Sequence, residues 1–86
     1  MILHVASAKY IEDYKIEISF NDGNFGVIDL GDEHFFSGPV FGPLKDKKIF
    51  SNFIIDPELN TIVWPNGADL APEYLESKLL VHHKNP

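Results

Sequence analysis

The sequence predicts an α+β fold: two antiparallel β-hairpins plus a leading strand, with two short helices. Apolar and polar residues alternate in "YKIEISF", which is the period of two of a half-buried strand. The stretches "NDGN" and "PELN" are turn signals, and an apolar run lies on each side of both. Leu75 and Leu79 stand four residues apart, as on one face of a terminal helix. A chain of 86 residues makes a single domain, 1–86, in the order β-β-β-α-β-β-α.

The N-terminal half contains the leading strand and the first hairpin. Residues 2–9 are rich in apolar side chains and are expected to form the leading strand. Residues 15–30 form the hairpin, because Asp22 and Gly23 favour a tight turn between two alternating runs. So short a connection makes the two strands antiparallel.

The C-terminal half contains both helices and the second hairpin. Residues 31–43 are rich in glycine, proline and phenylalanine, which indicates an ordered loop packed on the domain. Asp46 is a good N-cap for a middle helix of one or two turns. Residues 53–64 are predicted to form a strand, a turn and a second strand. A terminal helix is expected over residues 72–80, with Asp69 as a cap from just outside it.

The core is predicted from the apolar positions of these elements. Its members are Val5, Ile16, Ile18, Phe20, Val27, Leu30, Leu44, Phe50, Ile55, Ile62, Leu70 and Leu75. Trp64 and Tyr74 are expected to be partly buried, each with a hydrogen-bond partner for its polar atom.

Charge and composition exclude several kinds of function. The chain has 13 acidic and 7 basic residues, a formal net charge of −6, and no arginine. Nucleic-acid binding depends largely on neutralising phosphates, so we expect no nucleic-acid partner. No apolar run approaches the roughly 20 residues of a membrane span, so we expect no membrane partner. The absence of cysteine and of a signal peptide at the N-terminus favours a cytoplasmic protein.

No set of residues in the sequence carries recognisable catalytic chemistry. There is no phosphate-binding glycine loop and no visible nucleophile–base pair. No catalytic residue and no cofactor is therefore predicted, and an enzyme is the less favoured class of protein. His82 and His83 are adjacent, so they cannot line one helix face as metal-binding histidines do four residues apart. No metal site is predicted.

Three stretches resemble a known family. "FNDGNFGVIDL", "GPVFGPLKD" and "FIIDPELNTIVWPNGADLAPEYL", with the spacing between them, look like the bacterial domain-of-unknown-function 2442 family. The resemblance extends from the first strand to the terminal helix, and "WPNGAD" is its most specific part. It implies a fold like the N-terminal domain of a structural-genomics protein from Nitrosomonas. It also implies a second small protein encoded by the adjacent gene, in an arrangement similar to a toxin–antitoxin pair.

Two functions of different classes fit the sequence. The first is a protein-binding module, an antitoxin-like partner of a neighbouring small protein, whose aromatic anchors come from Phe35, Phe36, Phe41 and Trp64. The second is a small-ligand binder or enzyme with a pocket near "WPNGAD", where Asp69, Asn66 and Trp64 supply an acid, an amide and a stacking face. The position of Asp69 distinguishes them, because a cap points at backbone amides and a functional acid points into a pocket. The oligomeric state is not defined by the sequence.

Overall fold

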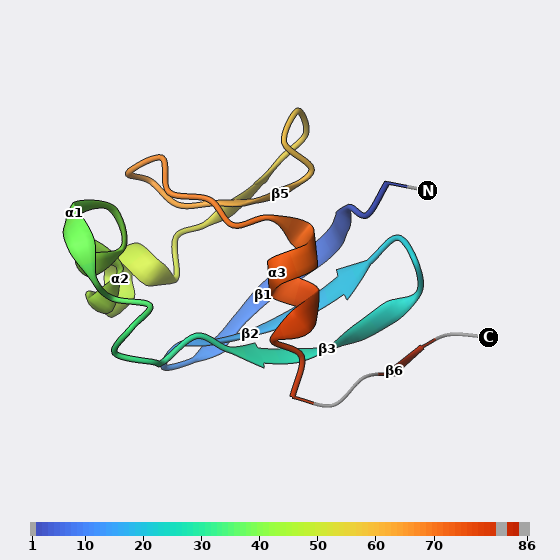
Figure 1. Cartoon of the computed structure of the whole chain (residues 1–86), viewed down its shortest axis with the longest axis horizontal. Coiled ribbons are helices and arrows are strands. Elements are labelled where there is room, and N and C mark those ends of the chain that lie inside the picture. The colour runs from blue at the N-terminus through green and yellow to red at the C-terminus, as the bar shows by residue number, and fades with distance from the viewer. Residues whose placement is uncertain (1, 81–82, 85–86) are drawn as a thin grey trace.

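The computed structural model describes residues 2–80 and 83–84, and it has the predicted α+β architecture (Figure 1). The main sheet is antiparallel and contains, in spatial order, β1 (Val5–Glu12), β2 (Lys15–Phe20), β3 (Asn24–Asp29) and β6 (His83–Lys84). A second, two-stranded antiparallel sheet contains β4 (Ile54–Asp56) and β5 (Thr61–Val63). The helical elements are α1 (Gly38–Phe41), the 3-10 helix η1 (Gly42–Lys45), α2 (Lys47–Phe50) and α3 (Pro72–Ser77).

The first hairpin is confirmed. Ile16 of β2 lies opposite Ile28 of β3, and Lys15 lies opposite Asp29. The turn closes as expected, because the Asp22 carboxylate accepts a hydrogen bond from the Asn24 amide at 2.9 Å and Gly23 has a φ of 91°.

The leading strand lies further along the chain than predicted. β1 begins at Val5 and continues to Glu12, where it lies opposite Lys15. Asp13 makes this possible by adopting a left-handed φ of 49°, which lets the chain reverse directly into β2. The predicted limits of this strand, residues 2–9, were wrong. They rested on apolar content and not on the geometry of the turn.

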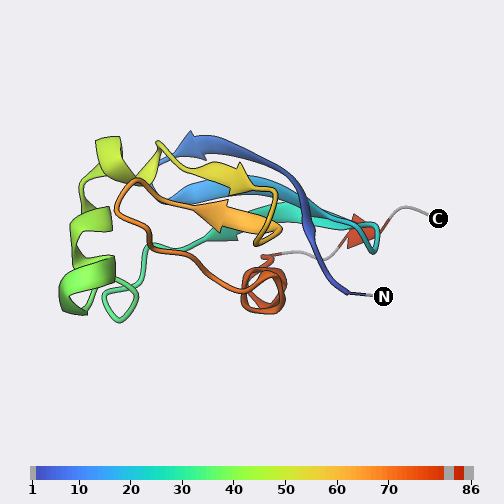
Figure 2. The same cartoon turned by 90° about the horizontal axis from the view of Figure 1, so that it is seen from above.

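The second hairpin and α3 cover one face of the main sheet, and the core lies between these two layers (Figures 1 and 2). The buried apolar residues are Val5, Ile16, Ile18, Phe20, Ile28, Leu30, Leu44, Phe50, Ile62, Trp64, Ala68, Leu75 and Leu79. Of the predicted core, Val27, Ile55 and Leu70 are only partly buried. The register explains Val27: Ile28 and Leu30 face the core, so the alternation of the strand turns Val27 to the other side.

The predicted loop of residues 31–43 is partly helical. Its second half folds into α1 and the start of η1, each with a proline in its first turn. Proline is compatible with a first turn because the amide it lacks would have no helical partner there. The loop prediction was therefore wrong for Gly38 onward.

The middle helix begins at the predicted cap. The Asp46 carboxylate accepts a hydrogen bond from the Lys48 amide at 2.9 Å, and α2 follows directly. Phe50, at the end of α2, is fully buried. Asp46 thus fixes the point at which the chain turns into the core.

Asp46→Ala should lower the free energy of unfolding by about 0.5–2 kcal/mol, because the orphan amide of α2 loses its acceptor. Asp46→Asn should cost less, since asparagine also caps well. Thermal melts followed by circular dichroism measure the difference. An alanine variant as stable as the parent chain would show that the cap does not hold this turn.

The terminal helix ends earlier than predicted. α3 spans Pro72–Ser77, whereas the expectation was 72–80. Leu79 pairs with Ile28 as an isolated bridge, and the Leu80 amide donates to the Val27 carbonyl at 2.9 Å. The chain therefore leaves the helix after about one and a half turns and pairs with the main sheet.

Candidate functional site

The "WPNGAD" stretch is a tight loop that reverses the chain after β5. The Trp64 amide donates to the Ala68 carbonyl and the Gly67 amide donates to the Trp64 carbonyl, both at 2.9 Å. Gly67 has a φ of 87°, which favours glycine there. The loop returns as a short extended segment, and Asp69 bridges to Val63 on β5.

Trp64 lies in the core and is only 2% exposed. Its indole Nε1–H donates to the Phe50 carbonyl at 2.8 Å, so the polar atom is satisfied. The rings of Phe35, Phe50 and Phe53 surround it, with centroids 5.8–6.4 Å away. The structure thus gives the predicted stacking residue a packing role, and the expectation of partial burial was too low.

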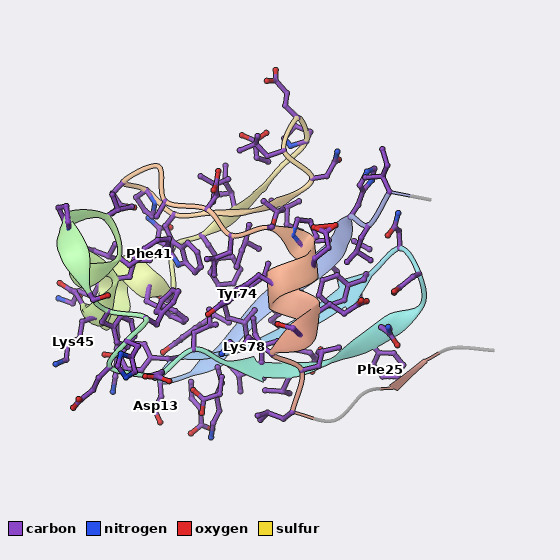
Figure 3. The ribbon with its side chains drawn as sticks, viewed as in Figure 1. Asp13, Phe25, Phe41, Lys45, Tyr74 and Lys78 are labelled. Carbon is purple, nitrogen blue, oxygen red and sulfur yellow. The ribbon has the colours of Figure 1, made fainter. Side chains whose placement is uncertain are left out.

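The other predicted aromatic anchors also lie in this aromatic cluster. Phe35 and Phe41 are partly buried, and their ring centroids are 5.2 Å apart. Phe41 lies at the helical end of the molecule in Figure 3. Both rings pack against the core, so part of each is not accessible to a partner.

Asn66 ties the loop to the helical region. Its side-chain amide donates to the Val40 carbonyl of α1 at 2.7 Å, and its Oδ1 accepts from the Ala68 amide at 3.1 Å. Both ends of the side chain therefore serve the fold. These two bonds fix the orientation of the Asn66 side chain.

Asp69 does not cap the terminal helix. Its side chain is exposed, and within residues 2–80 it makes no hydrogen bond to the first amides of α3. The N-cap position is Ala71, whose side chain has no acceptor. The backbone of Asp69 is held in an extended conformation beside β5, which leaves it too far back along the chain to reach the helix. The predicted cap was wrong.

Asp69→Ala and Asp69→Asn should both leave the free energy of unfolding within about 0.5 kcal/mol of the parent chain, as exposed positions without fixed partners do. Chemical denaturation of both variants tests this. A loss above about 1 kcal/mol for alanine but not for asparagine would mean that the carboxylate accepts a hydrogen bond in solution.

A depression of about 350 Å³ lies beside this loop, on the outer side of the second hairpin. It is lined by Asn52, Ile54, Val63, Trp64 and Pro65. Ile54 and Val63 lie directly opposite one another on β4 and β5, so their side chains share a face. Ile54 is 64% exposed. Figure 2 looks onto this side of the hairpin, and no other described segment crosses it.

We call the outward side chains of Ile54 and Val63, with Asn52 and Pro65 beside them, the hairpin face. Sequence reasoning missed it. The signal was present in "FIID", because two adjacent isoleucines in one strand must point to opposite sides. Ile55 faces the core side and Ile54 faces solvent.

A second depression, of about 450 Å³, lies on the outer side of the main sheet. It is lined by Ser7, Glu17, Ile18, Ser19, Phe20, Gly23, Asn24, Phe25, Gly26 and Val27. Phe25 lies opposite His83 of β6, so the chain's own C-terminal strand flanks this depression. The Ser7 and Ser19 hydroxyls bond to each other across the strands. The contacts at this depression are therefore contacts of the fold itself.

A third depression, of about 150 Å³, contains more ionisable groups. It is lined by Asp29, Leu30, Asp32, His34, Phe35, Tyr74 and Lys78. The Asp29 and Asp32 carboxylates accept hydrogen bonds from backbone amides two residues on, at 2.8 Å. The Lys78 ammonium lies 5.3 Å from the centre of the Tyr74 ring (Figure 3). These contacts give each of the four side chains a local structural partner.

The lysines gather at the helical end of the molecule. Lys45, Lys47 and Lys48 are exposed on η1 and α2. Lys47 forms an ion pair with Asp13 at 3.0 Å, and the hydrogen bond and charge of Asp13 raise the pKa of Lys47 above its usual value. Both partners are more than half exposed, so this pair contributes little to stability.

Within the described part of the chain, no three His, Asp or Glu side chains converge to hold a metal ion. His82, considered above, lies outside that part. None of the described helices is long and apolar enough to cross a membrane.

Fold and site together define a small α+β protein whose second hairpin carries an uncovered apolar face next to a tight Trp-Pro-Asn-Gly loop. The family model described as "Protein of unknown function (DUF2442)" matches residues 5–79, and the chain belongs to that family. Comparison with curated proteins finds no match, and comparison with solved structures finds none either. The likeness to the Nitrosomonas domain therefore stays a prediction.

Proposed function

We propose that this chain is a protein-binding module, the antitoxin-like partner of a small protein encoded by the adjacent gene. The observation that carries the proposal is the uncovered Ile54–Val63 pair of the hairpin face. Ile54 is 64% exposed and the opposite Val63 is partly buried, so the pair leaves branched apolar area in water, which costs free energy and is typical of a contact surface.

The hairpin face supports protein binding better than small-ligand chemistry. The lining of its depression contains one polar side chain, Asn52, and no acid. Asp69, Asn66 and Trp64 were the expected acid, amide and stacking face, and only Trp64 borders the depression. A site for a polar substrate needs converging polar groups, whereas an apolar contact surface does not.

Co-expression with the product of the adjacent gene tests the proposal. The two chains should co-elute in a fixed ratio in size-exclusion chromatography after capture through a tag on this chain. Ile54→Ser should abolish co-elution, because a hydroxyl replaces the exposed apolar group at the centre of the face. Ile11→Ser is the matched control, since Ile11 is also an exposed strand isoleucine, 41% accessible, but belongs to the main sheet.

Two results would remove the support for this function. One is the absence of any stoichiometric partner when both genes are expressed. The other is a complex that forms equally well with Ile54→Ser and with Ile11→Ser.

A further inference from the structure

We propose that the hairpin face takes a basic amphipathic helix of a protein partner, with apolar side chains against Ile54 and Val63 and lysine or arginine over the surrounding carboxylates. This inference rests on the function proposed above and specifies the chemistry of the partner.

The charged residues of the segment that carries the face are all acidic. From residue 49 to residue 77 the chain contains no lysine, and its charged residues are Asp56, Glu58, Asp69, Glu73 and Glu76. Asp56, Glu58 and Asp69 have no ion pair within residues 2–80. A partner that brings cations would therefore gain attraction without first breaking an existing pair.

The carboxylates lie next to the apolar pair. Val63 bridges to Asp69 on one side and lies opposite Ile54 on the other, so Ile54, Val63 and Asp69 form one row across three neighbouring segments. Side chains in such a row point to the same side of the sheet. Asp56 is two residues beyond Ile54 on β4 and shares its side. One of its oxygens, Oδ1, accepts hydrogen bonds from the Glu58 and Leu59 amides at 2.8 and 3.1 Å, and the carboxylate keeps its negative charge. The apolar strip is thus flanked by acids on the same surface.

The outer side of the main sheet provides the contrast. There Lys9 lies opposite Glu17, and Lys15 lies opposite Asp29. Opposite charges across neighbouring strands neutralise one another, as on an ordinary solvated face. The one-signed surface is therefore a property of the second hairpin and does not simply follow from the acidity of the whole chain.

The dimensions of the face favour a helix as the occupant. β4 and β5 have three residues each, so the strip is about 10 Å long, which is close to two helical turns. A helix stripe one or two side chains wide fits the Ile54–Val63 pair. The long stems of lysine and arginine on its flanks can extend over the strip to the carboxylates. Helices cover sheet faces in this way in layered folds.

Synthetic peptides test the partner chemistry directly. The probe is a lysine–leucine peptide of about 14 residues with leucines three and four positions apart, which forms a helix with one apolar stripe. Three control peptides are used: the same composition scrambled, glutamate in place of lysine, and an alternating lysine–leucine sequence that favours a strand. Binding is measured by titration, and the surface is mapped by amide chemical shifts of the ¹⁵N-labelled chain.

The helical basic peptide should shift amides of residues 52–70 and bind at least tenfold more tightly than each control peptide. Ile54→Ser should weaken its binding about tenfold, and Asp69→Asn about threefold, with a weaker dependence on salt. Ile11→Ser and Glu33→Gln are matched controls of the same chemistry away from the hairpin, and both should leave binding unchanged.

Other outcomes would overturn the inference. Tighter binding of the acidic, scrambled or strand-forming peptide would contradict the stated chemistry, as would shifts confined to the main sheet or no measurable binding. These failures are separable from failure of the proposed function. Suppose that Ile54→Ser abolishes binding of a co-expressed partner, but the basic peptide does not displace that partner. This result would support the proposed function and contradict a basic helix as the partner.

Discussion

Trp64→Ala should lower the free energy of unfolding by about 3–5 kcal/mol, enough to unfold much of the population of a domain of this size. Trp64 is 2% exposed and contacts the rings of three phenylalanines, so truncation would leave a large cavity. It would also leave the Phe50 carbonyl without the indole donor that lies 2.8 Å away. Urea denaturation followed by far-ultraviolet circular dichroism measures the loss, since the only tryptophan has been removed.

Trp64→Phe separates packing from hydrogen bonding. It retains an aromatic ring but not the N–H donor, so its cost should be about 1–3 kcal/mol. An alanine variant that loses under 1 kcal/mol would show that the ring is not part of the core in solution. Equal losses for alanine and phenylalanine would assign the whole effect to the hydrogen bond.

The first hairpin was predictable because local and long-range signals agree there. The alternation of "YKIEISF" turns Ile16 and Ile18 to one side, and Asp22-Gly23 matches the turn the strands require. Such agreement leaves one register that buries the apolar face. The cap at Asp46 was predictable for a similar reason, because a cap depends only on residues within the same turn.

Predictions failed where a distant segment determines the local structure. Asp69 has the residue type and position of a cap, but pairing with Val63 holds it in an extended conformation. Apolar residues continue at helical spacing through Leu79, but Leu79 pairs with Ile28 of β3 and lies outside the helix. In both cases a backbone pairing with a distant segment outweighed a weak local preference.

The candidate site shows the same division. The sequence pointed to the Trp-Pro-Asn-Gly loop, and the structure places the hairpin face beside it. The sequence could not indicate that Trp64 would be buried and Ile54 exposed. Which of these side chains is buried depends on which side of β4 meets the main sheet. Residue type favours tryptophan as an anchor, whereas the burial of Trp64 leaves Ile54 and Val63 as the apolar side chains on this surface.

Leu75→Ala should lower the free energy of unfolding by about 2–5 kcal/mol, the range for a leucine truncated in a core. Leu75 is fully buried, and it is the buried residue of α3. A helix of six residues is not stable by itself, so its contacts with the core determine whether it forms. Loss of this anchor should also loosen the chain that follows, where the Leu80 amide bonds to the Val27 carbonyl. Thermal melts and hydrogen exchange of the Leu80 amide measure the two effects.

Tyr74→Ala is the control on the same helix. Tyr74 is 40% exposed and contacts Lys78 through its ring, so its removal should cost under about 1 kcal/mol and leave exchange at Leu80 slow. If Leu75→Ala lowers global stability but leaves the Leu80 amide protected, the strand-like pairing to β3 holds without α3. If exchange at Leu80 accelerates far more than global unfolding explains, α3 and the chain after it open together as a local unit. The second result is expected, because Leu79 is the other buried contact through which this end of the chain is attached to β3.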